Sequence, residues 1–105
     1  MKVGVPKEIK THEYRVGLTP ESVREYVAHG HTVLVETQAG AAIGADDAAY
    51  RRAGAVVVPD ARAVFEGAEL IVKVKEPQPA ELAMLRPHHL LFTYLHLAPD
   101  ARQAD

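Results

Sequence analysis

Short apolar runs alternate with stretches of helical character along the chain, and this alternation limits the possible folds more than any other feature. Five runs are short and apolar enough to form β-strands: 2–5, 31–36, 55–58, 69–74 and 90–95. Strands that alternate with helices pair in parallel through right-handed crossovers. Continuous apolar runs such as 33–35 and 55–58 are typical of strands that are covered on both faces. The sequence therefore predicts an α/β fold with an open, doubly wound, mainly parallel, Rossmann-like sheet of about five strands.

Capping residues mark the helices that separate these runs. Thr19-Pro20-Glu21 places a capping hydroxyl before a proline and an acidic residue, which is typical of a helix start, and Gly30 marks the end of that helix. Asp46 and Asp60 are predicted to cap two more helices. The helices are expected over 20–29, 47–53, 61–66 and 79–85, with a fifth beginning at 99–100.

The composition excludes several classes of function. Hydrophobic residues make up 48% of the 105, which supports one compact domain, and the 12 basic and 14 acidic residues form no basic stripe for nucleic acid. The chain has no cysteine, and its histidines lack metal-ligand spacing, so we expect no disulfide and no metal. No apolar run approaches the ~18–20 residues that cross a bilayer, and 1–8 is not a secretory signal, so we expect a cytoplasmic protein without a membrane partner.

The glycine-rich segment 40–44 follows a strand, as a phosphate-binding loop would. However, Gly40-Ala41-Ala42-Ile43-Gly44 lacks the G-x-G-x-x-G spacing, and no long helix follows it. We therefore interpret this segment as a turn and predict that the chain has no dinucleotide fingerprint and no cofactor-binding residues.

Three polar residues follow predicted strands at their carboxyl ends. Arg15 lies in the long polar connection 6–18 after the first strand, Lys75 lies just past the fourth strand, and His96 lies just past the fifth. Lys73 would share a face with Lys75 only if the strand continued that far. In open parallel sheets, ligands bind beyond the carboxyl ends of the strands, where the strand order reverses. We therefore expect Arg15, Lys75 and His96 to converge at one edge of the sheet.

These three residue types suit a small 2-oxo acid. Arginine can hold a carboxylate by two hydrogen bonds, lysine can polarise a carbonyl oxygen, and histidine can exchange a proton near neutral pH. Each residue also has a structural interpretation. Arg15 and Lys75 could simply be solvent-exposed, and His96 could be a hydrogen-bonded core histidine.

Several motifs resemble those of a known family. The N-terminal signature shared by alanine dehydrogenases and nicotinamide nucleotide transhydrogenase alpha subunits is similar to three segments here: Gly4-Val5-Pro6-Lys7-Glu8, Glu13-Tyr14-Arg15-Val16 and Thr19-Pro20. Two later segments resemble the alanine dehydrogenase branch: 73–77 (KVKEP) and 91–98 (LFTYLHLA). The resemblance extends over the whole chain.

The resemblance implies an NAD-dependent oxidoreductase of L-alanine catabolism. Such enzymes reversibly convert L-alanine, NAD and water to pyruvate, ammonium and NADH. The resemblance assigns binding of the substrate's carboxylate and oxo groups to Arg15 and Lys75, and the acid/base role to His96. It also implies a homo-oligomer, because the family forms hexamers.

The resemblance also implies that a domain is missing from these 105 residues. In the family, an NAD-binding domain with a glycine fingerprint and a catalytic aspartate follows this region, and a later segment completes the substrate domain. Residues 1–105 therefore resemble the N-terminal part of the substrate domain. We expect this chain alone to be inactive, and the helix that begins at 99–100 without room to finish favours a piece of a longer protein.

Some residues depart from the family signature, and two alternative functions stay open. His12 stands where asparagine is usual and Gly17 where alanine is usual, but neither change removes a charge from the expected site. Glycine at 17 is expected to loosen the loop that includes Arg15. One alternative is the corresponding part of a transhydrogenase alpha subunit. The other is a stand-alone, non-catalytic module of the same fold.

Overall fold

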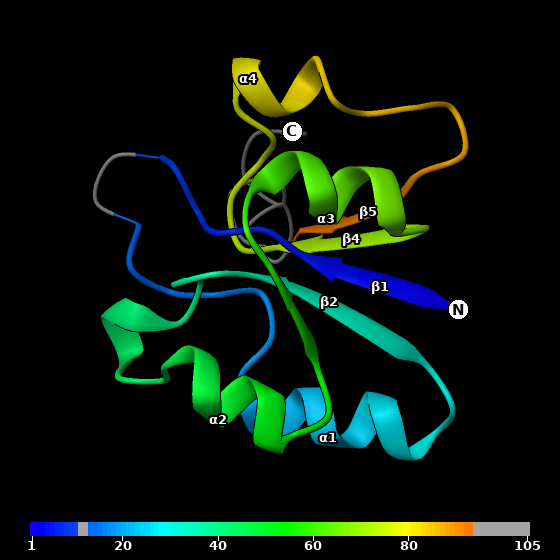
Figure 1. Cartoon of the computed structure of the whole chain (residues 1–105). Helices are drawn as coiled ribbons and strands as arrows, with labels where there is room; N and C mark the ends of the chain where they lie inside the picture. Colours follow the sequence, from blue (N-terminus) through cyan, green and yellow to red (C-terminus); the bar gives the residue numbers. More distant parts are fainter. Residues whose placement is uncertain (11–12, 94–105) are drawn as a thin grey trace, which may run out of the picture.

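The computed structural model describes residues 1–10 and 13–93, and its centre is a five-stranded, all-parallel sheet (Figure 1). The strand order is β3-β2-β1-β4-β5. The strands span β1 Lys2–Val5, β2 Thr32–Glu36, β3 Val56–Val58, β4 Leu70–Lys73 and β5 Leu90–Thr93. This confirms the predicted doubly wound α/β fold. The expected residues 94–95 of the last strand and the helix start at 99–100 lie outside the described residues.

The helices begin where the capping residues predicted. They are α1 Pro20–Ala28, α2 Asp47–Arg52, α3 Ala61–Gly67 and α4 Pro79–Leu82, with a 3-10 helix η1 at Ala41–Ile43. The N-cap side chains of Thr19, Asp46 and Asp60 each accept a hydrogen bond from a first-turn backbone N–H, at 3.3, 2.8 and 2.9 Å. The last helix is shorter than the predicted 79–85. The Glu81 side chain accepts a hydrogen bond from the Gln78 backbone N–H at its start, and beyond it the backbone N–H groups of Met84 and Leu85 bond to carbonyls three residues back, as in turns.

The helices form one layer on each side of the sheet. Figure 1 shows α1 and α2 together on one side and α3 on the other. Val23 of α1 and Tyr50 of α2 pack in one apolar core with the side chains of β1 and β2. On the opposite side α3 approaches β1 closely at Gly4, where a Cβ would lie 2.7 Å from atoms of Val64 and Ala68. Glycine at this position therefore lets α3 pack directly on the strand backbone.

The edges of the sheet are less covered than the apolar runs predicted. Val56 of β3 is 50% exposed, although the run 55–58 was expected to be covered on both faces. In β5, the side chains of Leu90, Leu91 and Phe92 are 41–57% exposed. Both are edge strands of the described sheet, and a continuous apolar run there does not imply burial. The expectation of two covered faces is therefore met only in part for β3, where Val57 and Val58 pack against the two cores and Val56 stays half exposed.

The strand order reverses between β1 and β4. From β1 the chain winds outward through β2 to β3, then crosses back to form β4 on the other side of β1. Such a switch point opens a crevice outside the carboxyl ends of the two central strands. Because β1 and β4 are neighbours in the sheet, the connection after Val5 lies next to the segment after Lys73. In the described part of the chain, no helix has the length and apolarity needed to cross a bilayer.

Candidate functional site

The connection between β1 and α1 is held against the sheet at its far end. Val16 and Leu18 are buried, and the hydroxyl of Tyr50 donates a 2.8 Å hydrogen bond to the Leu18 carbonyl. Burial raises the pKa of Tyr50 to about 12, so this hydroxyl keeps its proton. A Cβ on Gly17 would collide with the carbonyl of Val72 in β4. The connection is therefore packed directly against β4 at the residue that was expected to loosen it.

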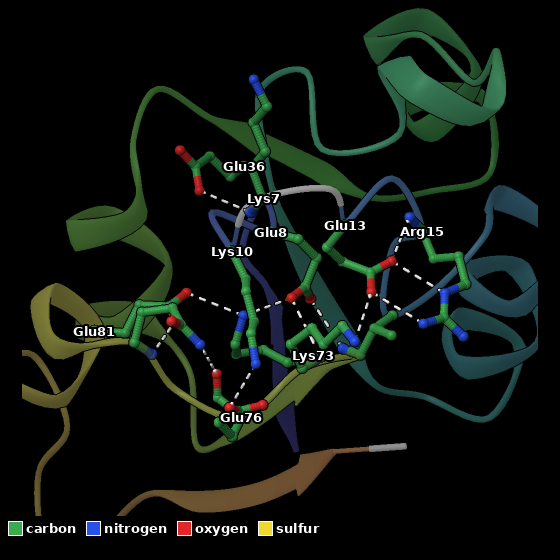
Figure 2. A network of polar contacts seen from close by, with 12 residues as sticks. Lys7, Glu8, Lys10, Glu13, Arg15, Glu36, Lys73, Glu76 and Glu81 are labelled. Carbon is green, nitrogen blue, oxygen red and sulfur yellow. Dashed lines mark hydrogen bonds and ion pairs between the residues drawn. The ribbon is translucent and has the colours of Figure 1, made fainter. Parts of the chain in front are cut away.

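Glu8 joins the segment after β1 to the segment after β4. Its side chain is only 2% exposed. Its carboxylate accepts hydrogen bonds from the backbone N–H of Val74 at 2.9 Å and of Lys75 at 3.3 Å. It also accepts a 2.8 Å bond from Nζ of Lys73 (Figure 2). One buried carboxylate thus fixes the backbone that leads from β4 to Lys75.

Lys73 is the centre of a buried ion triad. Its side chain is 1% exposed, and its Nζ lies 2.8 Å from Oε1 of Glu8 and 3.1 Å from Oε2 of Glu81. Among the described residues, this Oε2 accepts no well-aligned hydrogen bond, whereas Oε1 of Glu81 accepts one from the Gln78 backbone at 2.8 Å. Two carboxylates and one ammonium leave the triad with a net charge of −1. Because β4 ends at Lys73, this lysine does not share the exposed position of Lys75.

Arg15 and Lys75 meet on the carboxylate of Glu13. Oε2 of Glu13 accepts hydrogen bonds from the backbone N–H of Arg15 at 2.7 Å and from its Nε at 3.0 Å. Oε1 accepts a third from Nη2 of Arg15 at 3.0 Å, and Nζ of Lys75 lies 3.7 Å from the same oxygen. The hydrogen bond from Arg15 is the main cause that lowers the pKa of Glu13, while burial opposes it. The same contact raises the pKa of Arg15.

The two cations differ from the buried Lys73 in their access to solvent. The side chain of Arg15 is 59% exposed and that of Lys75 is 25% exposed, whereas Glu13 beneath them is 2% exposed. A cavity of about 450 Å³ opens beside Arg15 and Glu13, and Lys75 is not among the residues that line it. Glu8, Glu13 and Arg15 line one part of it, and Gln38, Ala39, Ala41 and Ala42 line another. This size is sufficient for a small organic acid.

The segment around η1 was predicted to be a turn without a ligand role. The structure confirms a tight turn, with η1 between Gly40 and Gly44, but also makes the segment a wall of the cavity. The backbone N–H of Gln38 donates a 2.9 Å hydrogen bond to Asp47, which anchors this wall to α2. The sequence contains no motif that reveals this contribution, because it depends on where the crossover after β2 lies.

Two more acidic residues flank the site. Oε2 of Glu76 lies 2.9 Å from Nζ of Lys10, in an exposed ion pair between the first connection and the segment after β4. Lys10 is the main cause that lowers the pKa of Glu76. Glu36, at the end of β2, accepts a 2.8 Å hydrogen bond from the backbone N–H of Lys7. Burial raises the pKa of Glu36.

The structure brings two of the three predicted site residues together. Arg15 and Lys75 lie on one carboxylate at the switch point, and His96 lies outside the described residues. Thr93, the last residue of β5, pairs with Lys73, so β4 and β5 end at the same edge of the sheet. Within residues 1–10 and 13–93, no group of three acidic or histidine side chains is arranged to hold a metal ion.

The acidic partners of these cations were not predicted. Glu13 could have been found, because it lies only two residues before Arg15, and an acidic and a basic side chain so close in sequence can form a local contact. Glu8 and Glu81 could not, since they meet Lys73 only after the sheet has formed. The signature segment 4–8 did contain Glu8, but nothing in the segment indicates a lysine partner.

The sequence matches a family profile described as "Alanine dehydrogenase/PNT, N-terminal domain" over residues 4–105. The alanine dehydrogenase of Halomonas elongata is 53% identical over 100 residues, which cover 95% of this chain and 27% of that protein. The alanine dehydrogenase of Bacillus subtilis is 50% identical over 105 residues, which cover 100% of this chain and 28% of that protein. The chain therefore spans just over a quarter of the length of these relatives.

Two solved structures share the fold. An L-alanine dehydrogenase superposes with a TM-score of 0.87 at 54% identity, over 99% of this chain and 28% of that one. A transhydrogenase from Sinorhizobium meliloti superposes with a TM-score of 0.84 at 28% identity, over 97% of this chain and 30% of that one. The backbone similarity is nearly the same for both, and the sequence identity is about twice as high for the first.

Proposed function

Because the chain belongs to the alanine dehydrogenase/PNT N-terminal domain family, we propose that residues 1–105 are the N-terminal part of the substrate domain of an NAD-dependent L-alanine dehydrogenase. The complete protein would convert L-alanine, NAD and water to pyruvate, ammonium and NADH, and would catalyse the reverse reaction. The sequence identity of 50–53% to curated alanine dehydrogenases supports this activity over hydride transfer between nucleotides. The other alternative, a stand-alone non-catalytic module, would have the same fold but would not oxidise L-alanine.

The observation that supports this proposal most directly is the meeting of two cations at the switch point. The guanidinium of Arg15 and the ammonium of Lys75 contact one carboxylate oxygen, that of Glu13, at 3.0 and 3.7 Å. Cations that converge on a carboxylate in the chain can also converge on a small 2-oxo acid. We assign the substrate carboxylate to Arg15, because its planar fork can form two hydrogen bonds to it. We assign the oxo group to Lys75, whose compact charge stabilises the negative charge that develops there.

We propose His96 as the acid/base residue, on its sequence position three residues after the end of β5. During oxidation of alanine, water adds at the carbon that has lost hydride and ammonia then leaves, and each step moves a proton that a histidine can exchange near neutral pH. NAD supplies the hydride acceptor. The 38–44 segment lacks a dinucleotide fingerprint, so we assign NAD binding to a part of the protein beyond these residues.

The test is steady-state kinetics of the complete protein in both directions. We expect Arg15→Ala to raise the KM for pyruvate strongly and His96→Ala to lower turnover by about 10²–10⁴-fold with pyruvate still bound. Lys75→Ala should raise the KM for pyruvate and lower turnover as well, because we assign Lys75 to the oxo group of the substrate, whose charge changes during the reaction. Arg24→Ala is a control for loss of positive charge, since Arg24 is an exposed arginine on α1, and it should leave both constants unchanged.

Two results would count against the proposal. If the complete protein forms no NADH from L-alanine and NAD, the activity is wrong. If His96→Ala retains near-normal turnover, the histidine is not the acid/base residue. The chain of residues 1–105 alone should form no NADH above a blank, because it lacks the residues that we assign to NAD.

A further inference from the structure

We propose that Glu13 is a specificity-determining residue, which offsets one of the two positive charges of the site and so favours singly charged 2-oxo acids over doubly charged ones. The inference rests on the proposed function, because it assumes that Arg15 and Lys75 bind the substrate. It adds a residue to which neither the family resemblance nor the predicted site assigns a role.

The contacts of Glu13 account for its place in the site. The carboxylate binds Arg15 through the backbone N–H, Nε and Nη2, so it occupies one edge of the guanidinium. None of these bonds uses Nη1, and the Arg15 side chain is 59% exposed. Because arginine has five N–H donors in a rigid fork, the pair with Glu13 orients the guanidinium and still leaves the Nη1–Nη2 edge for a second carboxylate.

The charges around the site are the reason for the proposed preference for singly charged 2-oxo acids. Arg15 and Lys75 contribute +2 at the rim of the site, and the Glu13 carboxylate that both contact reduces the charge of these three groups to +1. A further −1 beside them comes from the buried triad of Glu8, Lys73 and Glu81. The Glu13 side chain is 2% exposed, which limits the screening of its charge by water, and the Arg15 side chain that binds it is 59% exposed. A ligand with one negative charge can be held by the two cations, whereas a second negative charge on the ligand meets the carboxylate of Glu13. The hydrogen bonds from Arg15 keep Glu13 ionised at neutral pH.

Oxamate and oxalate test this charge effect without changing the size of the ligand. Both have the shape of pyruvate, and both keep its carboxylate next to a carbonyl carbon. Oxamate has an amide nitrogen in place of the pyruvate methyl group and is singly charged. Oxalate has a carboxylate oxygen there and is doubly charged at neutral pH. The ratio of their inhibition constants therefore reports the charge preference of the site, while differences in shape largely cancel.

The experiment uses the complete protein with bound NADH, at one fixed ionic strength. In the unaltered protein, oxamate should bind at least as tightly as oxalate. In Glu13→Gln, which keeps the side-chain shape, the ratio should move toward oxalate by roughly tenfold, because one unit charge close to the ligand has been removed. The matched control is Glu25→Gln, which makes the same change of charge at an exposed position on α1, on another part of the fold. It should move the ratio by less than about threefold.

Binding of both compounds is also measured by calorimetry, so that the result does not depend on turnover. If Glu13→Gln leaves the ratio unchanged, or tightens both ligands equally, Glu13 does not select for charge and the inference is wrong. If the unaltered protein prefers oxalate by more than tenfold, the inference is wrong whether or not the variant folds. Failure of the proposed function has a different signature, since the unaltered protein would then bind neither oxamate nor pyruvate.

Discussion

Replacement of Lys73 by methionine should destabilise the domain more than any single change of an exposed charge. Methionine keeps most of the apolar stem of lysine and removes only the ammonium group. In the unaltered chain, Nζ of Lys73 lies 2.8 Å from the Glu8 carboxylate and 3.1 Å from that of Glu81, and both glutamate side chains are at most 2% exposed. The substitution would leave these two buried carboxylates without a counter-ion. The substitution therefore isolates the contribution of the cation.

The expected loss is about 3–5 kcal/mol, the usual cost of removing one partner from a buried ion pair. The upper end applies here, because two carboxylates lose the same cation. For a domain whose total stability is about 5–15 kcal/mol, this loss is between about a fifth of the stability and all of it. In contrast, Glu81→Gln should cost only about 1–2 kcal/mol, since it removes the excess negative charge and keeps the pair between Lys73 and Glu8, and loses an acceptor at only one of its two contacts, with the Gln78 backbone N–H or with Lys73.

The measurement is urea unfolding followed by circular dichroism, for the two single variants and the double variant. The double variant should lose less than the Lys73→Met variant, because only one stranded carboxylate remains, and the coupling should exceed about 0.5 kcal/mol. A loss below about 1 kcal/mol for Lys73→Met would refute the reasoning, because it would mean that the ammonium is not needed to balance buried charge. A loss for Glu81→Gln as large as that for Lys73→Met would refute it too.

Two further predictions concern other parts of the fold. Gly4→Ala should cost about 1–3 kcal/mol by overpacking, measured as the loss of unfolding free energy in urea, since the new Cβ would lie 2.7 Å from atoms of Val64 and Ala68. Glu36→Gln should be as stable as the unaltered chain or more stable at pH 7, and should lose that advantage near pH 4. The raised pKa of Glu36 means that its carboxyl group binds a proton more tightly in the folded chain than in the unfolded chain. The ionised carboxylate therefore destabilises the fold, and this cost is absent at low pH and develops as the pH rises through the folded pKa. Urea midpoints at both pH values test this, and a variant that is less stable only at pH 7 would contradict it.

The local pattern of the chain was enough to predict the elements and the fold class. The side chains of Thr19, Asp46 and Asp60 cap the three longer helices as expected, because a capping side chain bonds to a backbone group only three residues away. The first strand was predicted with its observed bounds, Lys2–Val5, because Pro6 stops it. The alternation of strands and helices then leaves few topologies other than a doubly wound parallel sheet.

The rim of the site was only partly predictable. That Arg15 and Lys75 lie at one edge follows from the rule that parallel strands end on the same side. That they meet on a single oxygen of Glu13 does not follow from it, because the backbone of the first connection bends according to the contacts of Leu18 with Tyr50 and of Gly17 with Val72. These contacts join segments that are far apart in the sequence.

Burial and charge balance were decided by the tertiary structure alone. By residue type, Lys73 is as polar as Lys75, yet its side chain is 1% exposed where that of Lys75 is 25% exposed. The apolar run of β3 leaves Val56 half exposed because β3 is an edge strand of the described sheet. A pattern of residue types shows which positions can be buried, but a side chain's surroundings depend on the strands and connections that pack against it. The sequence by itself therefore determined the elements, their parallel pairing and the edge at which Arg15 and Lys75 lie. The partners of each charge were decided by packing between residues far apart in the sequence, such as Glu8 and Lys73, which are 65 positions apart.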